Sequence, residues 1–258
     1  SPAVGGLLSG NRDLEEEVAD PTTIGVVLRP RFAPGLSLAI DWYDIDLENA
    51  INAAVPQVAT DLCVDLPTLD NQFCGLISRD EDTGRINDFS QLPVNVASFT
   101  TSGYDFTLAY ALNTEKSGTF NVRLIGNSLQ KLTFVNLPNS DPDPQRGQLD
   151  KPEWQGSLDL TWERGPLIVN YGVNYFGTTQ RYTRLERTGD PDIVATRFYD
   201  YDSKTTQDLQ LRFEFREGLG AYLGVNNLTD EQPDIGEYFY PVSAVGRFIY
   251  AGVEISKF

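Results

Sequence analysis

The densest group of side chains that could bind a ligand lies in the stretch 182–201. It combines arginines with aromatic residues, and its members are Tyr182, Arg184, Arg187, Arg197, Phe198, Tyr199 and Tyr201. Guanidinium groups and aromatic rings suit planar or anionic ligands, and the same side chains also suit packing within a loop. We predict ligand contact from Tyr182, Arg184, Arg197, Tyr199 and Tyr201, with loop packing as the alternative.

Two cysteines, Cys63 and Cys74, lie in a polar stretch and could form a disulfide or part of a metal or redox site. A tetrahedral metal site would need two more ligands, and the chain has no histidine to supply them. A disulfide needs only the pair and implies an oxidising compartment. We therefore predict a Cys63–Cys74 bridge, which would restrict the unfolded chain by roughly 2–3 kcal/mol. We expect no metal site and no cofactor.

The sequence offers little for catalysis. Without histidine, Ser–His and Cys–His nucleophile pairs are impossible within the chain. Neighbouring carboxylates occur at Asp80-Glu81-Asp82, where solvated loop charge is a simpler interpretation than a glycosidase pair. The net charge of −17 has the wrong sign for a phosphate-binding surface, which excludes nucleic acid as a partner. We expect a protein that is not an enzyme.

Alternation of apolar and polar residues predicts the elements that carry these groups. A period of two indicates strands with one apolar face. Nine segments show it: 24–32, 36–42, 104–112, 119–135, 154–162, 167–175, 208–215, 219–225 and 249–255. No stretch approaches the ~18 consecutive apolar residues of a membrane-spanning helix. The fold is therefore predicted to be all-β.

The segment 154–162 gives the clearest indication of a membrane. One face carries Trp154, Leu158, Leu160 and Trp162, and the opposite face is polar. Eight positions separate the two tryptophans, about 26 Å along a strand. A tilt of ~40° reduces this to roughly 20 Å, close to the ~25 Å apolar band of a membrane barrel and its flanking aromatic girdles. Trp42 ends another strand, and we predict that all three tryptophans form a lipid-facing girdle.

Short and long connections alternate along the chain. The short ones are 33–35, 113–118, 164–166 and 216–219, and the long ones are 48–92, 137–150, 184–204 and 229–245. Outer-membrane barrels have short periplasmic turns and long extracellular loops. Nine is an odd number, however, and an open sheet would leave two edges unpaired in lipid. We therefore predict that further strands come from an upstream part of the same gene product.

Four segments resemble the TonB-dependent outer-membrane receptors. In chain order they are 10–17, 34–51, 224–230 and 246–253. The first is similar to the entry of a late barrel strand, although Arg12 and Glu16 stand where the family has prolines. The resemblance implies that residues 1–258 are the carboxy-terminal part of a transmembrane antiparallel β-barrel, about the last nine of 22 strands. The amino-terminal plug and the earlier strands would then be absent from this chain.

The resemblance also implies a function and partners. The function would be energy-coupled uptake of a scarce solute, such as an iron chelate, cobalamin or an oligosaccharide, across the outer membrane of a Gram-negative bacterium. The partners would be the rest of the receptor, the TonB complex through the plug, outer-membrane lipid, and the barrel-assembly machinery through the carboxy-terminal strand. In this last role Phe258 is one residue out of phase with Val253 and Ile255. A passive porin and a secreted β-sandwich binding module are the alternatives.

Charged side chains are predicted to line the lumen of such a barrel. They are Arg29, Arg31, Asp41, Asp105, Arg123, Asp159, Asp208, Arg212, Glu214 and Glu254. They could contact a plug or a passing solute. The alternative is a barrel interior that is simply polar and mutually paired, and this is the interpretation we favour for any single residue.

Overall fold

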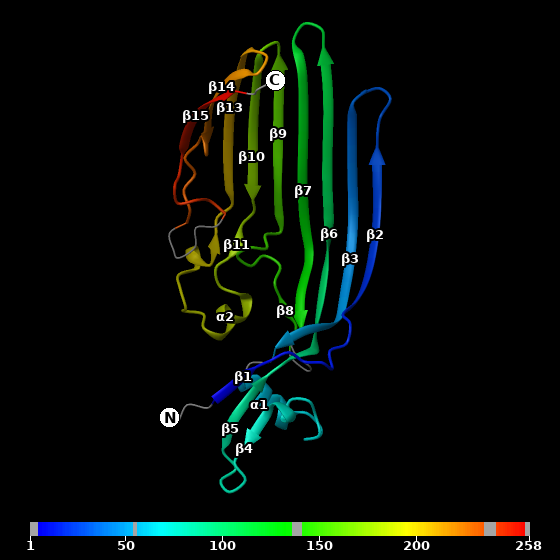
Figure 1. The fold of residues 1–258 in the computed structure, drawn as a ribbon, viewed down its shortest axis with the longest axis vertical. Helices are drawn as coiled ribbons and strands as arrows, with labels where there is room; N and C mark the ends of the chain where they lie inside the picture. The colour runs from blue at the N-terminus through cyan, green and yellow to red at the C-terminus, as the bar shows by residue number, and fades with distance from the viewer. Residues whose placement is uncertain (1–4, 54–55, 136–140, 235–240, 256–258) are drawn as a thin grey trace. The chain divides into compact units, whose positions relative to one another are not determined.

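A computed structural model describes residues 5–53, 56–135, 141–234 and 241–255 of the chain. Nine long strands and the short β8 form one mostly antiparallel sheet, ordered β15-β14-β13-β10-β9-β7-β6-β3-β2, with β8 beside β7 (Figure 1). The long strands are β2 (Val18–Leu28), β3 (Leu36–Ala53), β6 (Pro93–Thr114), β7 (Gly118–Val135), β9 (Trp154–Arg164), β10 (Leu167–Phe176), β13 (Lys204–Arg216), β14 (Leu219–Asn226) and β15 (Phe248–Ile255). The nine predicted strands are thus confirmed. They lie in one sheet instead of two stacked sheets, so the β-sandwich alternative is wrong.

The long connections carry the shorter elements. Between β3 and β6 lie α1 (Pro56–Asp65), the 3-10 helix η1 (Cys74–Leu76), β4 (Ile77–Arg79) and β5 (Ile86–Gln91). β1 (Gly5–Leu8) and β4 pair with the two edges of β5. The later connections contain β8 (Asp143–Pro144), β11 (Thr179–Gln180), α2 (Arg184–Gly189), η2 (Thr196–Phe198) and β12 (Asp200–Tyr201). Neither described helix is long and apolar enough to cross a membrane.

Two strands are much longer than their predicted segments. β3 and β6 contain 18 and 22 residues, whereas ~9–11 residues are enough to cross a bilayer. The sequence pattern detected only the part of each strand in which apolar and polar residues alternate. In β3 and β6 the additional residues lie toward the long connection 48–92, at the end opposite the short turns.

The structure corrects one end of a predicted strand. β2 stops at Leu28, and the backbone N–H of Ala33 donates to Pro30 O at 3.2 Å in the turn that follows. Pro30 has no N–H for a strand ladder, which accounts for the early end. Arg29 and Arg31 therefore lie outside the strand, and their assignment to its lumenal face is wrong.

The chain divides into two compact units. One comprises residues 1–21, 45–100 and 133–144, and the other comprises 22–44, 101–132 and 145–258. The first unit has a small apolar core of buried side chains, which are Ala59, Cys63, Phe73, Leu76, Phe89 and Val94. The predicted Cys63–Cys74 disulfide is present, with Cα atoms 4.7 Å apart. Because so small a core supplies little stability, the bridge that ties α1 to η1 is an important constraint.

Replacing both cysteines by serine should loosen the region between β3 and β6. Loss of a bridge across 11 positions costs about 2–3 kcal/mol. Limited proteolysis of the region should then accelerate by roughly two orders of magnitude, because cleavage follows local opening. Val64→Ser is a matched control, since its side chain is 60% exposed on the same helix. Equal cleavage rates for the double variant and the control would contradict the prediction.

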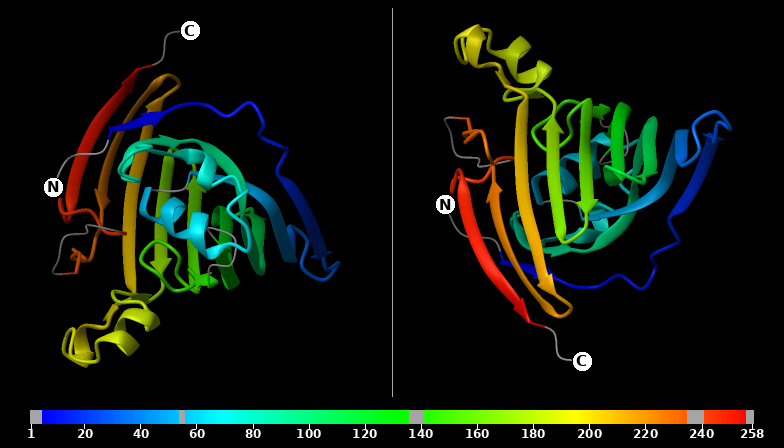
Figure 2. Two further views of the ribbon diagram at one scale, coloured as in Figure 1. Left: turned by 90° about the horizontal axis from the view of Figure 1, so that it is seen from below. Right: turned by 90° about the horizontal axis from the view of Figure 1, so that it is seen from above.

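The sheet of the second unit curves from β15 round to β2 (Figure 2), and its two faces differ in chemistry. Leu160 of β9 pairs with Val122 of β7 and Tyr171 of β10, which continues the apolar face. The adjacent Asp159 pairs with Arg123 and lies on the other face. The predicted alternation is confirmed, and a slip of one residue would exchange the two faces completely.

Leu160→Arg should impair assembly of the full-length receptor, whereas Asp159→Asn should leave it nearly intact. An arginine on a lipid face near mid-membrane costs about 2–4 kcal/mol in a barrel. That is a large part of a typical folding free energy of ~5–15 kcal/mol. Heat-modifiable gel migration measures the folded fraction, and equal migration of the two variants would show that the apolar face does not meet lipid.

Candidate functional site

Side chains on the polar face of the second unit hydrogen-bond across the strands. Thr161 Oγ1 and Asn170 Oδ1 lie 2.9 Å apart, and Asn170 Nδ2 donates to Gln210 Oε1 at 3.4 Å. Gln210 Nε2 in turn donates to the hydroxyl oxygen of Tyr250 at 3.3 Å. The chain of contacts links β9, β10, β13 and β15, and in this row the uncharged polar side chains are paired with one another.

Three tyrosines of this face lie over glycines of a neighbouring strand. A Cβ atom on any of these glycines would overlap the tyrosine above it, and the pairs are Tyr43 over Gly103, Tyr222 over Gly252 and Tyr250 over Gly224. Glycine inside a strand marks a site where another group approaches closely. The sequence analysis missed these pairs, although an interior glycine opposite a tyrosine is a readable signal once the register is known.

Gly224→Ala should destabilise the sheet by about 1–3 kcal/mol, because the added methyl group displaces Tyr250 and its contact with Gln210. Denaturant unfolding of the full-length receptor in detergent measures the loss. In the double variant Gly224→Ala/Tyr250→Ala the overlap is gone, so it should be no less stable than Tyr250→Ala alone. Additive losses would show that steric overlap is not the cause.

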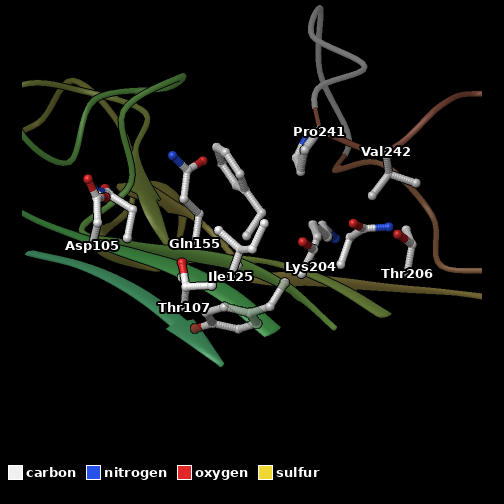
Figure 3. Close-up of a pocket in the computed structure, with 15 residues that line it drawn as sticks. Asp105, Thr107, Ile125, Gln155, Lys204, Thr206, Pro241 and Val242 are labelled. Atoms are coloured by element: carbon white, nitrogen blue, oxygen red, sulfur yellow. The ribbon is translucent and has the colours of Figure 1, made fainter. Parts of the chain in front are cut away.

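A cavity of about 650 Å³ opens on the polar face of the same unit. Figure 3 shows Pro241 and Val242, from the connection before β15, facing Lys204 and Thr206 across it. Its floor is two neighbouring cross-strand rows from β7, β9, β10 and β13. One row is Ile125, Ser157, Asn174 and Thr206, and the other is Asn127, Gln155, Phe176 and Lys204.

Lys204 fixes one side of this cavity. Its side chain is 11% exposed, and its Nζ lies 2.8 Å from Asp234 Oδ1 and 3.4 Å from Glu231 Oε1. Asn227 holds Glu231 in place, since its side chain exchanges two 2.8 Å hydrogen bonds with the Glu231 backbone. The lysine therefore ties the start of β13 to the connection after β14, and two carboxylates compensate its charge.

The predicted binding residues of the stretch 182–201 lie on a short hairpin and helix. The guanidinium of Arg181, which the sequence analysis missed, lies 6.0 Å from the Tyr182 ring centre and 5.6 Å from that of Tyr201. Arg187 covers Tyr199 at 5.2 Å. The structure thus brings Tyr182 and Tyr201 together at Arg181. This arrangement also fits the loop-packing alternative, because rings and arginines contact one another.

Another predicted member contacts a different ring. The guanidinium of Arg197 lies 4.7 Å from the ring centre of its neighbour Phe198, in η2. Arg184 begins α2, and its side chain lies outside the described part of the structure. Ligand contact by Tyr182, Arg184, Arg197, Tyr199 and Tyr201 stays a prediction.

A capping box begins α2. Glu186 Oε2 accepts hydrogen bonds from the backbone N–H and the hydroxyl of Thr183, at 2.7 and 2.8 Å. The Glu186 backbone N–H donates back to Thr183 Oγ1 at 3.2 Å. The hydrogen bonds from Thr183, that of the backbone first, hold the pKa of the Glu186 carboxyl below its ordinary value. This turn is therefore ordered by its own residues.

Acid should loosen α2. Because the pKa of Glu186 is lowered in the folded state, the stabilisation is complete above the pKa of an unperturbed glutamate. It is lost as the pH falls through the lowered value. Amide hydrogen exchange over 184–190, corrected for the intrinsic pH dependence of exchange, should accelerate in that range. Thr183→Ala removes the hydroxyl bond to Glu186 and keeps the backbone bond, so its acid response should be smaller. An unchanged response would contradict the assignment.

The acidic run at residues 80–82 lies in the turn between β4 and β5. Asp80 Oδ1 accepts hydrogen bonds from the hydroxyl and the backbone N–H of Thr83, at 2.7 and 2.8 Å. The side-chain bond, followed by the backbone bond, lowers the pKa of Asp80. A general acid needs a raised pKa, so Asp80 serves the turn instead. Within the described ranges no group of histidine, cysteine or acidic residues is arranged to hold a metal.

Aromatic side chains form two clusters on the apolar face. The Trp154 ring centre lies 6.0 Å from that of Phe106, and the Trp162 ring centre lies 6.3 Å from that of Phe120. Trp162 also donates from Nε1 to Ser117 O at 2.7 Å, in the short turn between β6 and β7. Trp42 lies two positions after the apolar residue Ile40 in β3, so the two side chains are on the same face of the strand. The two clusters mark opposite ends of the apolar stripe of β9.

These features define a segment of an outer-membrane barrel wall: one meander, one apolar face, one polar face, and alternating short and long connections. Residues 1–228 match the family model described as "TonB dependent receptor-like, beta-barrel". The chain belongs to this family, which confirms the resemblance to TonB-dependent receptors; of the four segments, 246–253 lies outside the matched residues. Barrels of this family are outer-membrane proteins of Gram-negative bacteria, and this chain is therefore an outer-membrane protein.

Solved structures share the fold. The siderophore receptor PirA from Acinetobacter baumannii is 15% identical with a TM-score of 0.58, over 96% of this chain and 33% of that one. The FrpB iron transporter from Neisseria meningitidis is 14% identical with a TM-score of 0.60, over 97% and 32%. The pyoverdine receptor FpvA from Pseudomonas aeruginosa PAO1 is 16% identical with a TM-score of 0.56, over 95% and 30%. The chain thus spans about a third of these receptors. Comparison with curated proteins gives no match.

Proposed function

We propose that this chain is part of a receptor that takes up a scarce solute across the outer membrane by energy-coupled transport. The observation that carries the proposal is a sheet with one apolar and one polar face, in a chain that belongs to the TonB-dependent receptor family. The apolar face would meet lipid, with Trp42, Trp154 and Trp162 as its girdle. The polar face would line the lumen.

The remainder of the receptor would complete the barrel. Each edge strand of the described sheet, β2 and β15, has a neighbour on one side only. Hydrocarbon does not tolerate unpaired backbone groups, so further strands of the same receptor would pair there, this chain being about the last nine of 22. A plug would fill the lumen and contact TonB, and the carboxy-terminal strand would contact the barrel-assembly machinery. Phe258, the expected assembly signal, lies outside the described residues.

The solute would first meet the long connections. Tyr182, Arg184, Arg197, Tyr199 and Tyr201 are the proposed contacts there, because they lie between β10 and β13 in the longest described connection of the second unit. Iron chelates, cobalamin and oligosaccharides are the candidate classes. Solved relatives named as siderophore receptors and an iron transporter support the first class, although identities of 14–16% extend only to the fold.

Uptake assays distinguish this function from a passive porin. The full-length receptor is expressed in cells that lack other receptors for radiolabelled ferric siderophores, cobalamin and oligosaccharides, and accumulation is followed with and without a protonophore. We expect accumulation of one class to fall to background when the proton-motive force is collapsed. Accumulation that persists without the proton-motive force would identify a porin and overturn the proposal.

A further inference from the structure

The cavity on the polar face is lined by hydrogen-bonding groups that the protein leaves free. Five uncharged polar side chains in the lining have no hydrogen-bonding partner among the described residues: Thr107, Gln155, Ser157, Asn174 and Thr206. They differ in this from Thr161, Asn170 and Gln210, which bond to one another elsewhere on the face. Hydroxyls and amides that point into an open cavity are available for a ligand.

The charged groups of the cavity are already engaged. Lys204 lies between the carboxylates of Glu231 and Asp234, and Asp105 Oδ1 accepts a 2.8 Å hydrogen bond from Asn127 Nδ2. Among the described residues of the lining there is therefore no free cation, and the carboxylates around Lys204 outnumber it. An anionic ligand would be repelled here, because those residues offer no free guanidinium or ammonium group to bind it.

The cavity also has an apolar side and a suitable size. Ile125, Phe176 and Val242 lie beside the polar residues, and Phe176 and Val242 are buried. Its volume of about 650 Å³ falls within the ~300–1,000 Å³ of sites for small molecules. Free hydroxyls and amides next to apolar surface, without free charge, match a ligand with many hydroxyl groups and apolar C–H faces.

We propose that this cavity is a binding subsite for an uncharged, hydroxyl-rich solute, of the chemical class of a neutral oligosaccharide. The proposal rests on the proposed uptake function and selects one of its three substrate classes. The solute would contact Ser157, Asn174 and Thr206 in one row and Gln155 in the other. Thr107 lies at the margin of these rows. The arginines of the stretch 182–201 are not part of this subsite.

The first test compares the affinities of the purified full-length receptor for neutral and anionic ligands. The probes are neutral oligosaccharides from two to seven residues, uronic-acid oligosaccharides of the same lengths, and ferric tricatecholate. Calorimetry should give the tightest binding for a neutral oligosaccharide, and at least about tenfold weaker binding for its uronate counterpart. Tightest binding of an anionic probe, or no binding of any neutral oligosaccharide, would overturn the proposal.

Variants then place the ligand in the cavity. Asn174→Leu and Gln155→Leu each remove one free amide and should weaken neutral binding about tenfold. Asn121→Leu is the matched control, because Asn121 is exposed on the polar face of β7 and does not line the cavity. Gln155→Lys adds a free cation and should shift the binding preference toward the uronates.

Heat-modifiable gel migration verifies that each variant folds. Asn174→Ala and Gln155→Ala replace any leucine variant that does not fold. Unchanged affinity in both cavity variants would overturn the proposal.

Failure of this subsite and failure of the uptake function give different results. The receptor could take up an iron chelate in a way that needs the proton-motive force and is unaffected by the cavity variants. That result would refute the subsite and leave the uptake function intact. Alternatively, the receptor could bind a neutral oligosaccharide, the cavity variants could weaken this binding, and a protonophore could leave uptake unchanged. That result would refute energy-coupled transport and leave the subsite intact.

Discussion

Backbone hydrogen bonding in a medium without water is the constraint on which this protein depends. Each peptide group of a strand in hydrocarbon needs a partner on a neighbouring strand, since no solvent can replace it. β9 and β10 meet this need through a continuous antiparallel register from the pair Arg164–Leu167 to the pair Gln155–Phe176. Once the register is fixed, the pleat sends alternate side chains to opposite faces, and every later feature of the wall follows from that division.

Side chains on the polar face meet a second requirement, because the wall of a lumen must be polar and still well packed. Glycines make this packing possible. Gly224 and Gly252 leave room for the rings of Tyr250 and Tyr222, and Tyr250 in turn reaches Gln210. The face therefore combines rows in which polar groups bond to one another with a cavity in which they remain free, and this contrast gives the cavity its chemical character.

The two proposed binding places differ in how their cations are engaged. In the connection between β10 and β13, arginines lie over aromatic rings, and the described ion pairs do not include Arg181, Arg187 or Arg197. Lys204 is the one cation among the described residues that line the cavity, and two carboxylates compensate its charge. An anionic group of a solute could therefore pair with a guanidinium in the connection, whereas a neutral solute could stack on the rings there or form hydrogen bonds in the proposed cavity subsite.

The sequence by itself determined the nine strands, the two faces and the Cys63–Cys74 bridge, because alternation and cysteine spacing are local properties that one strand or loop expresses alone. The alternation placed Arg29 and Arg31 in a strand, and this prediction was wrong because β2 ends at Leu28, before Pro30. Only the tertiary structure decided which residues meet across strands: Asn174 with Ser157 and Thr206, and Tyr250 with Gln210. These partners lie up to 40 positions apart, and they come together through strand register, which no single stretch of sequence encodes.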